Sequence, residues 1–189
     1  MGVIITDKTA TAMWQTLVHN ASEVCHQDLD EELESYLVFL LMRHLGDTNL
    51  AAQAIAPSYL QGMQSQGHSG LAQLQQVADQ CLLFSGLYPL RSRRRLVKAQ
   101  YYIDMGRSAY MQVAERVRQV YVELYENLSQ RFVEMMDILQ AIRCDKQNAA
   151  LDSLLLIENW HESHSEFARQ LLEQRFDQAS LHTPHPSKH

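Results

Sequence analysis

The sequence predicts an all-α protein, and three observations support this prediction. Apolar residues recur at spacings of three and four along nearly the whole of the 189-residue chain, as they do on one face of an α-helix. No run of alternating β-branched residues is bounded by turn residues, as a strand would be. Glycine or proline stands near the end of several apolar segments, where helices commonly stop. We therefore expect a bundle-like array of about six or seven helices.

Two amphipathic helices are predicted near the N-terminus. The first covers residues 7–26, where an aspartate or a threonine can cap the start and an apolar stripe follows. The second covers residues 28–46 and carries glutamates in its first turn, where the helix dipole favours negative charge. Its middle, residues 36–42, is apolar on all sides, so we expect the deepest burial there.

Shorter segments and then a long helix follow in the middle of the chain. Short helices are predicted over residues 47–56 and 58–66, because Pro57 stops the first of them. A long helix then runs from Ser69 to Gly86, since glycine is a common residue just past a helix end.

The next helix is expected from about Leu96 or Lys98 to Val117, and a glycine lies on its apolar face. Successive rotations of about 100° place Tyr102, Gly106 and Tyr110 together on that face. A glycine inside a helix costs about 1 kcal/mol relative to alanine. We therefore expect the backbone of another helix to approach closely at Gly106, and we expect this helix to pack against the two preceding long helices.

Two more long helices are predicted before the chain ends. One covers residues 120–144 and can be continuous with the preceding helix, because no helix breaker separates them. The other covers residues 149–176 and places His164 in the centre of an apolar stripe, so we expect this histidine to be buried. Residues 1–176 then form a single helical domain. Residues 177–189 contain two prolines and few aliphatic side chains, which predicts a disordered tail.

Composition limits the classes of protein to which this chain can belong. The formal net charge of −6 argues against general nucleic-acid binding, which needs a surplus of Lys and Arg. No apolar run approaches the roughly 20 residues that span a bilayer, and the N-terminus lacks the features of a secretory signal. Cys25, Cys81 and Cys144 are far apart and lie in apolar patterns, as reduced thiols of a cytosolic protein do. We therefore predict a cytoplasmic protein without membrane contact.

No sequence motif indicates a particular reaction. The chain has no glycine-rich phosphate loop, nucleophile elbow, Cys-x-x-Cys or H-E-x-x-H motif. The pattern Glu-x-x-His, which supplies ligands in di-iron helical bundles, occurs as Glu23–His26 and as Glu158–His161. Glu23, His26 and Glu158 fall away from the apolar faces, whereas the ligands of a metal in a bundle core must face inward. We therefore predict no metal and no cofactor, and we leave open whether the chain is an enzyme.

A basic run beside tyrosines is the clearest candidate binding surface. Four arginines precede the helix predicted to begin near residue 98, and Lys98 lies at its start. At the N-terminus of a helix these cations can bind phosphate or an acidic partner. A solvated connector is the alternative interpretation. A second candidate is the histidine of the last helix, either as a core histidine with satisfied hydrogen bonds or as a ligand-binding group. The candidate binding residues are Arg91, Arg93, Arg94, Arg95, Lys98, Tyr101 and His164.

Two segments of the chain resemble a family signature. They are D-Q-C-L-L-F-S-G-L-Y-P, which begins at Asp79, and Y-Y-I-D-M-G-R-S-A-Y, which runs from Tyr101 to Tyr110. They are similar to G-D-x-x-L-F-x-S-G-L-x-P and Y-Y-x-x-x-G-R-x-A-Y in an uncharacterised family of small bacterial helical proteins. This chain has Ala78 where the family pattern has glycine. The resemblance implies a bacterial cytosolic protein, and it assigns no activity, ligand or catalytic residue.

The absence of catalytic motifs favours a non-catalytic function. We expect an interaction or regulatory domain that binds a protein partner or forms a homodimer through residues 91–98 and the neighbouring tyrosines. The alternative is a helical small-molecule-binding protein, or a metal- or cofactor-dependent enzyme, with an interior pocket near His164.

Overall fold

The computed structural model describes residues 7–44, 54–88, 98–147 and 153–181 of the chain. Within these ranges the chain forms nine α-helices and no β-strand, so the all-α prediction is confirmed. None of these described helices is both long enough and apolar enough to cross a membrane. The helices are α1 (Asp7–Val24), α2 (Glu31–His44), α3 (Ile55–Gln64), α4 (Gly67–Leu87), α6 (Ala99–Ala114), α7 (Gln119–Gln130), α8 (Phe132–Gln147), α9 (Ser153–Ser163) and α10 (Glu166–Leu181).

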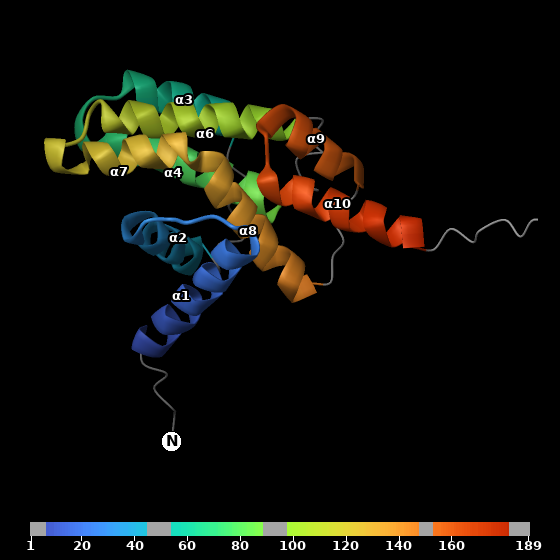
Figure 1. Ribbon diagram of the computed structural model, residues 1–189. Helices are drawn as coiled ribbons and strands as arrows, with labels where there is room; N and C mark the ends of the chain where they lie inside the picture. The colour runs from blue at the N-terminus through green and yellow to red at the C-terminus, as the bar shows by residue number, and fades with distance from the viewer. Residues whose placement is uncertain (1–6, 45–53, 89–97, 148–152, 182–189) are drawn as a thin grey trace, which may run out of the picture.

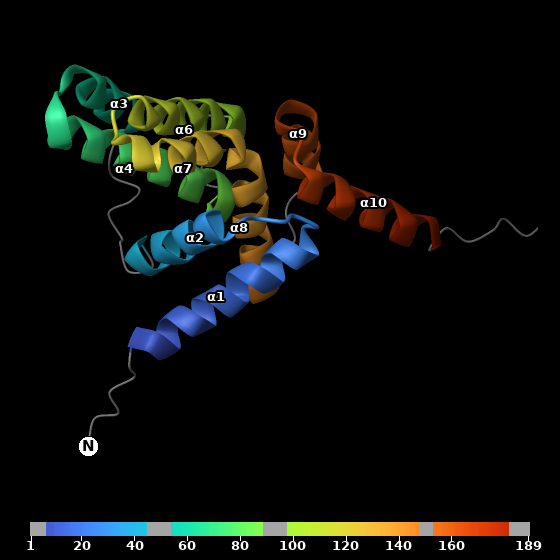
Figure 2. The same ribbon diagram turned by 60° about the vertical axis from the view of Figure 1, so that its left-hand side comes forward.

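Helices α4 and α8 each pack against several other helices. Helices α3, α4, α6 and α7 lie side by side at one end of the molecule, and α1 and α2 form a pair at the other end (Figure 1). Helix α8 runs between these groups and packs against both α4 and α1. Helices α9 and α10 form a second pair, which lies beside α6 and α8 (Figure 2).

The most continuous burial occurs in α4 and not in α2. Every residue from Val77 to Gly86 is buried, because α3, α6 and α8 all pack against this helix. In α2, Val38 and Leu40 are buried but Phe39 between them is exposed. The prediction that the deepest burial lies in the middle of this helix is therefore wrong, since solvent reaches the side that carries Phe39.

Gly106 is buried in α6, as predicted, but an unexpected neighbour explains it. A Cβ atom at this position would lie 2.6 Å from Cζ of Phe132 in α8 and 3.0 Å from Cβ of Cys81 in α4. Both distances are too short for ordinary packing, so the ring of Phe132, and not the backbone of another helix, requires glycine here. The predicted helix neighbours are confirmed. Helix α6 packs along α4, and the ring of Tyr110 meets the ring of Tyr36 in α2 with centroids 6.1 Å apart.

Two predicted long helices are each divided, which explains why more helices form than expected. The helix predicted over residues 120–144 is α7 followed by α8, with Arg131 between them. The helix predicted over residues 149–176 is α9 followed by α10. His164 has a positive φ of 56°, which a right-handed helix cannot accommodate, and Ser165 then caps the first turn of α10 through its hydroxyl.

The sequence left open whether the helix that ends near Val117 continues into the next one, and in the structure residues 115–118 separate α6 from α7. Two other boundaries differ from the predictions. Pro57 lies in the first turn of α3, where a missing N–H leaves no helix hydrogen bond unmade, and so it does not stop a helix. Most of the short helix predicted over residues 47–56 lies outside the described residues. Helix α10 continues to Leu181, past the predicted helix end at Phe176.

Candidate functional site

The predicted basic surface falls only partly within the described residues. Lys98 is exposed at the start of α6, and its Nζ lies 2.6 Å from Oε1 of Glu162 in α9. This carboxylate raises the pKa of the Lys98 amine. The cation therefore already has a partner, and the ion pair joins the start of α6 to the end of α9. Four predicted binding residues lie outside the described residues: Arg91, Arg93, Arg94 and Arg95.

Tyr101 lies in the first turn of α6, close to Lys98 in the chain, and is partly covered. Its ring lies edge-on to the ring of Tyr102 with centroids 5.5 Å apart, and Tyr102 itself is buried. Burial raises the pKa of the Tyr101 hydroxyl. With 37% of its surface accessible, Tyr101 can still contact a partner molecule beside the Lys98–Glu162 ion pair.

Helix α9, which carries Glu162, exposes an apolar face. Leu154, Ile157 and Trp160 stand at every third position and are 61%, 44% and 46% exposed. We name these three residues the α9 face. Glu158 and His161 border it, and a shallow pocket of about 320 Å³ lies along the helix. Exposed large apolar side chains that include a tryptophan are typical of protein contact surfaces.

His164 is exposed, and its predicted burial is therefore wrong. This residue joins α9 to α10 with a left-handed backbone conformation. Because the helix breaks there, the residues on its two sides no longer share one stripe: Ile157 and Trp160 are exposed, whereas Phe167 is buried. The interior pocket near His164 was expected because one continuous helix would bury this residue. The helix is not continuous, so the structure does not support that expectation.

The two Glu-x-x-His motifs lie on different surfaces of the molecule. Glu23 and His26 are exposed at the end of α1, which confirms their predicted outward direction. Glu158 is half-buried and His161 is exposed on α9. Among the described residues, no group of three or more His, Cys, Asp or Glu side chains could hold a metal ion.

A buried carboxylate that sequence reasoning missed lies where three helices meet. Asp79 of α4 is only 1% exposed. Its Oδ1 accepts hydrogen bonds from the hydroxyl of Tyr36 in α2, at 2.6 Å, and from the hydroxyl of Tyr110 in α6, at 2.8 Å. Its Oδ2 lies 3.4 Å from Nη1 of Arg43, whose side chain is largely exposed. We name these four residues the Asp79 cluster.

The Asp79 cluster can gain or lose one proton near neutral pH. Burial raises the pKa of Asp79 to about 6, although the two tyrosine hydrogen bonds and Arg43 act in the opposite direction. Burial and the nearby carboxylate also raise the pKa of Tyr36 and of Tyr110. Both tyrosines therefore keep their protons at neutral pH and serve as hydrogen-bond donors.

Asp79 had a recognisable signal in the sequence. Asp79 and Gln80 stand between Ala78 and Cys81 in the apolar stretch of α4, where a carboxylate needs a polar partner. Asp79 is also the aspartate of the first segment that resembles the bacterial family, and Tyr110 ends the second segment. The structure brings these two residues into contact across 31 positions of sequence, a pairing that neither segment reveals alone.

A second buried carboxylate, Asp137 of α8, holds the start of α10. Its Oδ1 accepts a hydrogen bond from the hydroxyl of Ser165 at 2.6 Å, and its Oδ2 accepts one from the backbone N–H of Phe167 at 3.2 Å. Burial raises the pKa of Asp137 to about 7 in spite of these hydrogen bonds. Because both donors belong to the cap of α10, this carboxylate is a structural contact between two helices.

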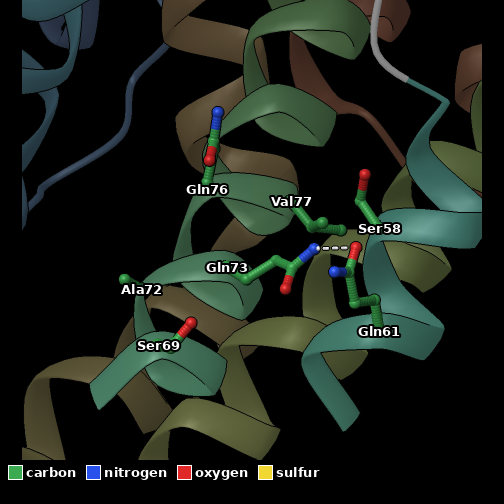
Figure 3. Close-up of a pocket in the computed structure, with 7 residues that line it drawn as sticks. All are labelled: Ser58, Gln61, Ser69, Ala72, Gln73, Gln76 and Val77. Atoms are coloured by element: carbon green, nitrogen blue, oxygen red, sulfur yellow. Dashed lines mark hydrogen bonds between the residues drawn. The ribbon is translucent and has the colours of Figure 1, made fainter. Parts of the chain in front are cut away.

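A polar pocket of about 460 Å³ lies between α3 and α4 (Figure 3). Nε2 of Gln73 donates a hydrogen bond to Oε1 of Gln61 at 2.8 Å across it. The other polar groups on its walls are Ser58, Ser69 and Gln76, none of which is charged. This pocket therefore offers neutral hydrogen bonds only, and we assign no ligand to it.

These observations define the class of the protein: an all-α fold with two buried carboxylates and an exposed apolar helix face. Comparison of the chain with known protein families, with curated proteins and with solved structures finds no match. The resemblance to the bacterial family signature thus stays a prediction. The function has to be inferred from the geometry of the described residues.

Proposed function

We propose that this protein is a non-catalytic interaction domain that pairs with a second copy of itself through the α9 face. The observation that carries the proposal is the exposure of Leu154, Ile157 and Trp160 on one side of a helix. A contiguous apolar face that contains a tryptophan gains stability when a partner removes it from water.

The spacing within the α9 face suits a second copy of the chain. Ile157 lies midway between Leu154 and Trp160. When two copies of α9 pack antiparallel about a twofold axis, Ile157 meets its own copy, and Leu154 meets Trp160 of the partner subunit. The same surface on both subunits is then self-complementary, as a twofold interface requires.

Charged groups at the edge of the α9 face suit the rim of an interface. Glu158 and His161 border the apolar residues, and the ion pair between Lys98 and Glu162 lies at the end of the helix. Polar rims surround apolar centres in most protein interfaces. Arg91, Arg93, Arg94 and Arg95 precede Lys98 in the sequence, and we propose that these cations bind acidic residues of the second copy.

A cytoplasmic location is part of the same proposal. None of Cys25, Cys81 and Cys144 forms a disulfide, and burial raises the pKa of each thiol. Free thiols are typical of proteins from a reducing compartment, in which disulfides rarely persist.

Sedimentation velocity over a wide range of protein concentration tests this proposal. The unmodified chain should form a dimer, and Ile157→Glu should weaken dimerisation by at least about tenfold, because it places two negative charges next to the twofold axis. Val120→Glu is the matched control, since Val120 is 76% exposed on α7, outside the α9 face. A chain that stays monomeric at high concentration, or a dimer that Ile157→Glu leaves intact, would contradict the proposal.

A further inference from the structure

An open groove of about 660 Å³ lies between α4, the end of α6 and α7. Most of its walls are apolar or aromatic. A volume of roughly 300 to 1,000 Å³ is typical of sites for small organic molecules. We name this feature the α4–α7 groove. Its apolar and aromatic walls are formed by Leu71, Val113, Val117, Tyr121, Leu124 and Tyr125.

Two arginines, Arg116 and Arg118, line the α4–α7 groove. Nη1 of Arg116 donates a hydrogen bond to the carbonyl oxygen of Gly62 at 3.2 Å, which holds the guanidinium in place over the groove. Arg118 is exposed and lies at the N-cap position of α7. Among the described residues, neither arginine forms an ion pair, whereas Lys98 and Arg131 do. In a chain with a net charge of −6, two cations beside one groove, with no ion pair to the described carboxylates, favour an anionic ligand.

The start of α7 adds to this positive charge. No side chain caps α7, and its first turn carries no acidic residue. The helix dipole therefore adds partial positive charge beside Arg118 and Tyr121, which both line the groove.

The groove also borders the Asp79 cluster. Gln75 lines it, and Nε2 of Gln75 donates a hydrogen bond to the hydroxyl of Tyr36 at 3.3 Å. Tyr125 also lines the groove, and the centroids of its ring and of the Tyr110 ring are 6.3 Å apart. Hydrogen bonds to Asp79 hold Tyr36 and Tyr110, so the groove residues Gln75 and Tyr125 pack against side chains that are fixed in place.

We propose that the α4–α7 groove is a binding site for a small organic anion with a flat apolar body, such as an aromatic carboxylate or sulfonate. The apolar walls and Tyr121 and Tyr125 contact the body of the ligand. Arg116 and Arg118 bind its anionic group by charge-assisted hydrogen bonds. The groove and the α9 face share no residue, so either proposal can fail without the other.

Fluorescence titration with anilinonaphthalene sulfonate tests this proposal on the full chain. Binding should be saturable with one site, and the uncharged analogue phenylnaphthylamine should bind at least about tenfold more weakly, because it lacks the anionic group. Arg118→Gln should weaken sulfonate binding by about tenfold, and Arg118→Lys should restore part of it. Arg175→Gln, which removes one positive charge from α10, should leave binding unchanged.

Val24→Glu locates the bound dye. Val24 lines a different, apolar pocket of about 410 Å³ between α1, α8 and α10. This substitution should leave sulfonate binding unchanged if the dye lies in the α4–α7 groove. Loss of binding on Val24→Glu, equal binding of the charged and uncharged dyes, or an unchanged affinity in Arg118→Gln would overturn the proposal. Thermal unfolding monitored by circular dichroism verifies that each variant is folded.

Discussion

Asp79 and Asp137 are both 1% exposed, but different kinds of group hold them. Asp79 accepts hydrogen bonds from two tyrosine side chains on two other helices. Asp137 accepts hydrogen bonds from the hydroxyl of Ser165 and from the backbone N–H of Phe167, both at the start of one helix. Burial raises the pKa of both carboxyls, to about 6 for Asp79 and to about 7 for Asp137.

The difference between their partners matters for function. A helix cap has to stay in place for α10 to begin at residue 166, so the surroundings of Asp137 serve the fold. Asp79 is connected through Tyr36 to Gln75, which lines the α4–α7 groove. A ligand that moves Gln75 can therefore affect Asp79 through Tyr36. The hydrogen bonds of Asp137 go to the start of α10 instead, so they change when that helix start unfolds.

The largest effect is expected for Asp137→Ala. This substitution should lower the free energy of unfolding at pH 5 by about 4 kcal/mol, because it leaves two buried donors without an acceptor and opens a small cavity. Asp79→Ala should cost about 2 kcal/mol, since Tyr36 is half-buried and water can satisfy its hydroxyl. Urea unfolding at pH 5 measures both, with the exposed Asp104→Ala as control. Equal losses for the two variants would show that Asp79 and Asp137 contribute equally to stability.

The second prediction concerns the pH dependence of stability that Asp79 alone contributes. Its pKa is about 6 in the folded chain and near 3.9 when unfolded, so the folded state holds the proton more tightly. The stability that this proton provides is present below about pH 4 and is lost as pH rises through about 6, a change of roughly 3 kcal/mol. Asp79→Asn cannot titrate. The free energy of unfolding of the unmodified chain, relative to Asp79→Asn, should therefore fall between pH 4 and pH 7.

Urea unfolding of both chains at several pH values measures this difference. Asp137 titrates in both proteins, so its contribution cancels in the comparison. A difference that stays constant from pH 4 to pH 7, or that rises with pH, would show that Asp79 has no raised pKa in the folded chain.

The smallest effect separates the two tyrosines of the Asp79 cluster. Tyr110→Phe should cost about 1.5 kcal/mol, because its hydroxyl and Asp79 are both shielded from water. Tyr36→Phe should cost about half as much, since Tyr36 is half-buried and water can replace its hydroxyl. Urea unfolding at pH 7 measures both variants. A larger loss for Tyr36→Phe would mean that the side of the cluster next to the groove is the more rigid one.

Local patterns in the sequence predicted those parts of the fold that depend on neighbours along the chain. The first two helices and α4 appear close to their predicted positions, because a stripe of apolar residues lies within each segment. The face of α6 that carries Tyr102, Gly106 and Tyr110 is buried for the same reason. The single-domain and homodimer predictions are not tested by these elements and stay predictions.

Other features could not be inferred because their causes are not local. The helix breaks at His164, which adopts a left-handed backbone conformation although it is not a glycine, so the sequence does not indicate the break. The break leaves His164 exposed instead of in the core. The ring that leaves no room for a side chain at Gly106 belongs to Phe132 of α8, which is separated from α6 in the sequence by α7. Arg116 and Arg118 line the α4–α7 groove because α4, α6 and α7 surround it, and the sequence does not specify that arrangement.

By itself, the sequence determined that this chain is helical and which faces of several helices avoid water, since these properties follow from the order of apolar and polar residues. Only the tertiary structure decided that Asp79 meets Tyr36 and Tyr110, that Asp137 caps α10, and which apolar residues stay exposed on α9. The reason is that a helix pattern specifies one buried side of each element, whereas the identity of the neighbour on that side depends on how all the helices pack together.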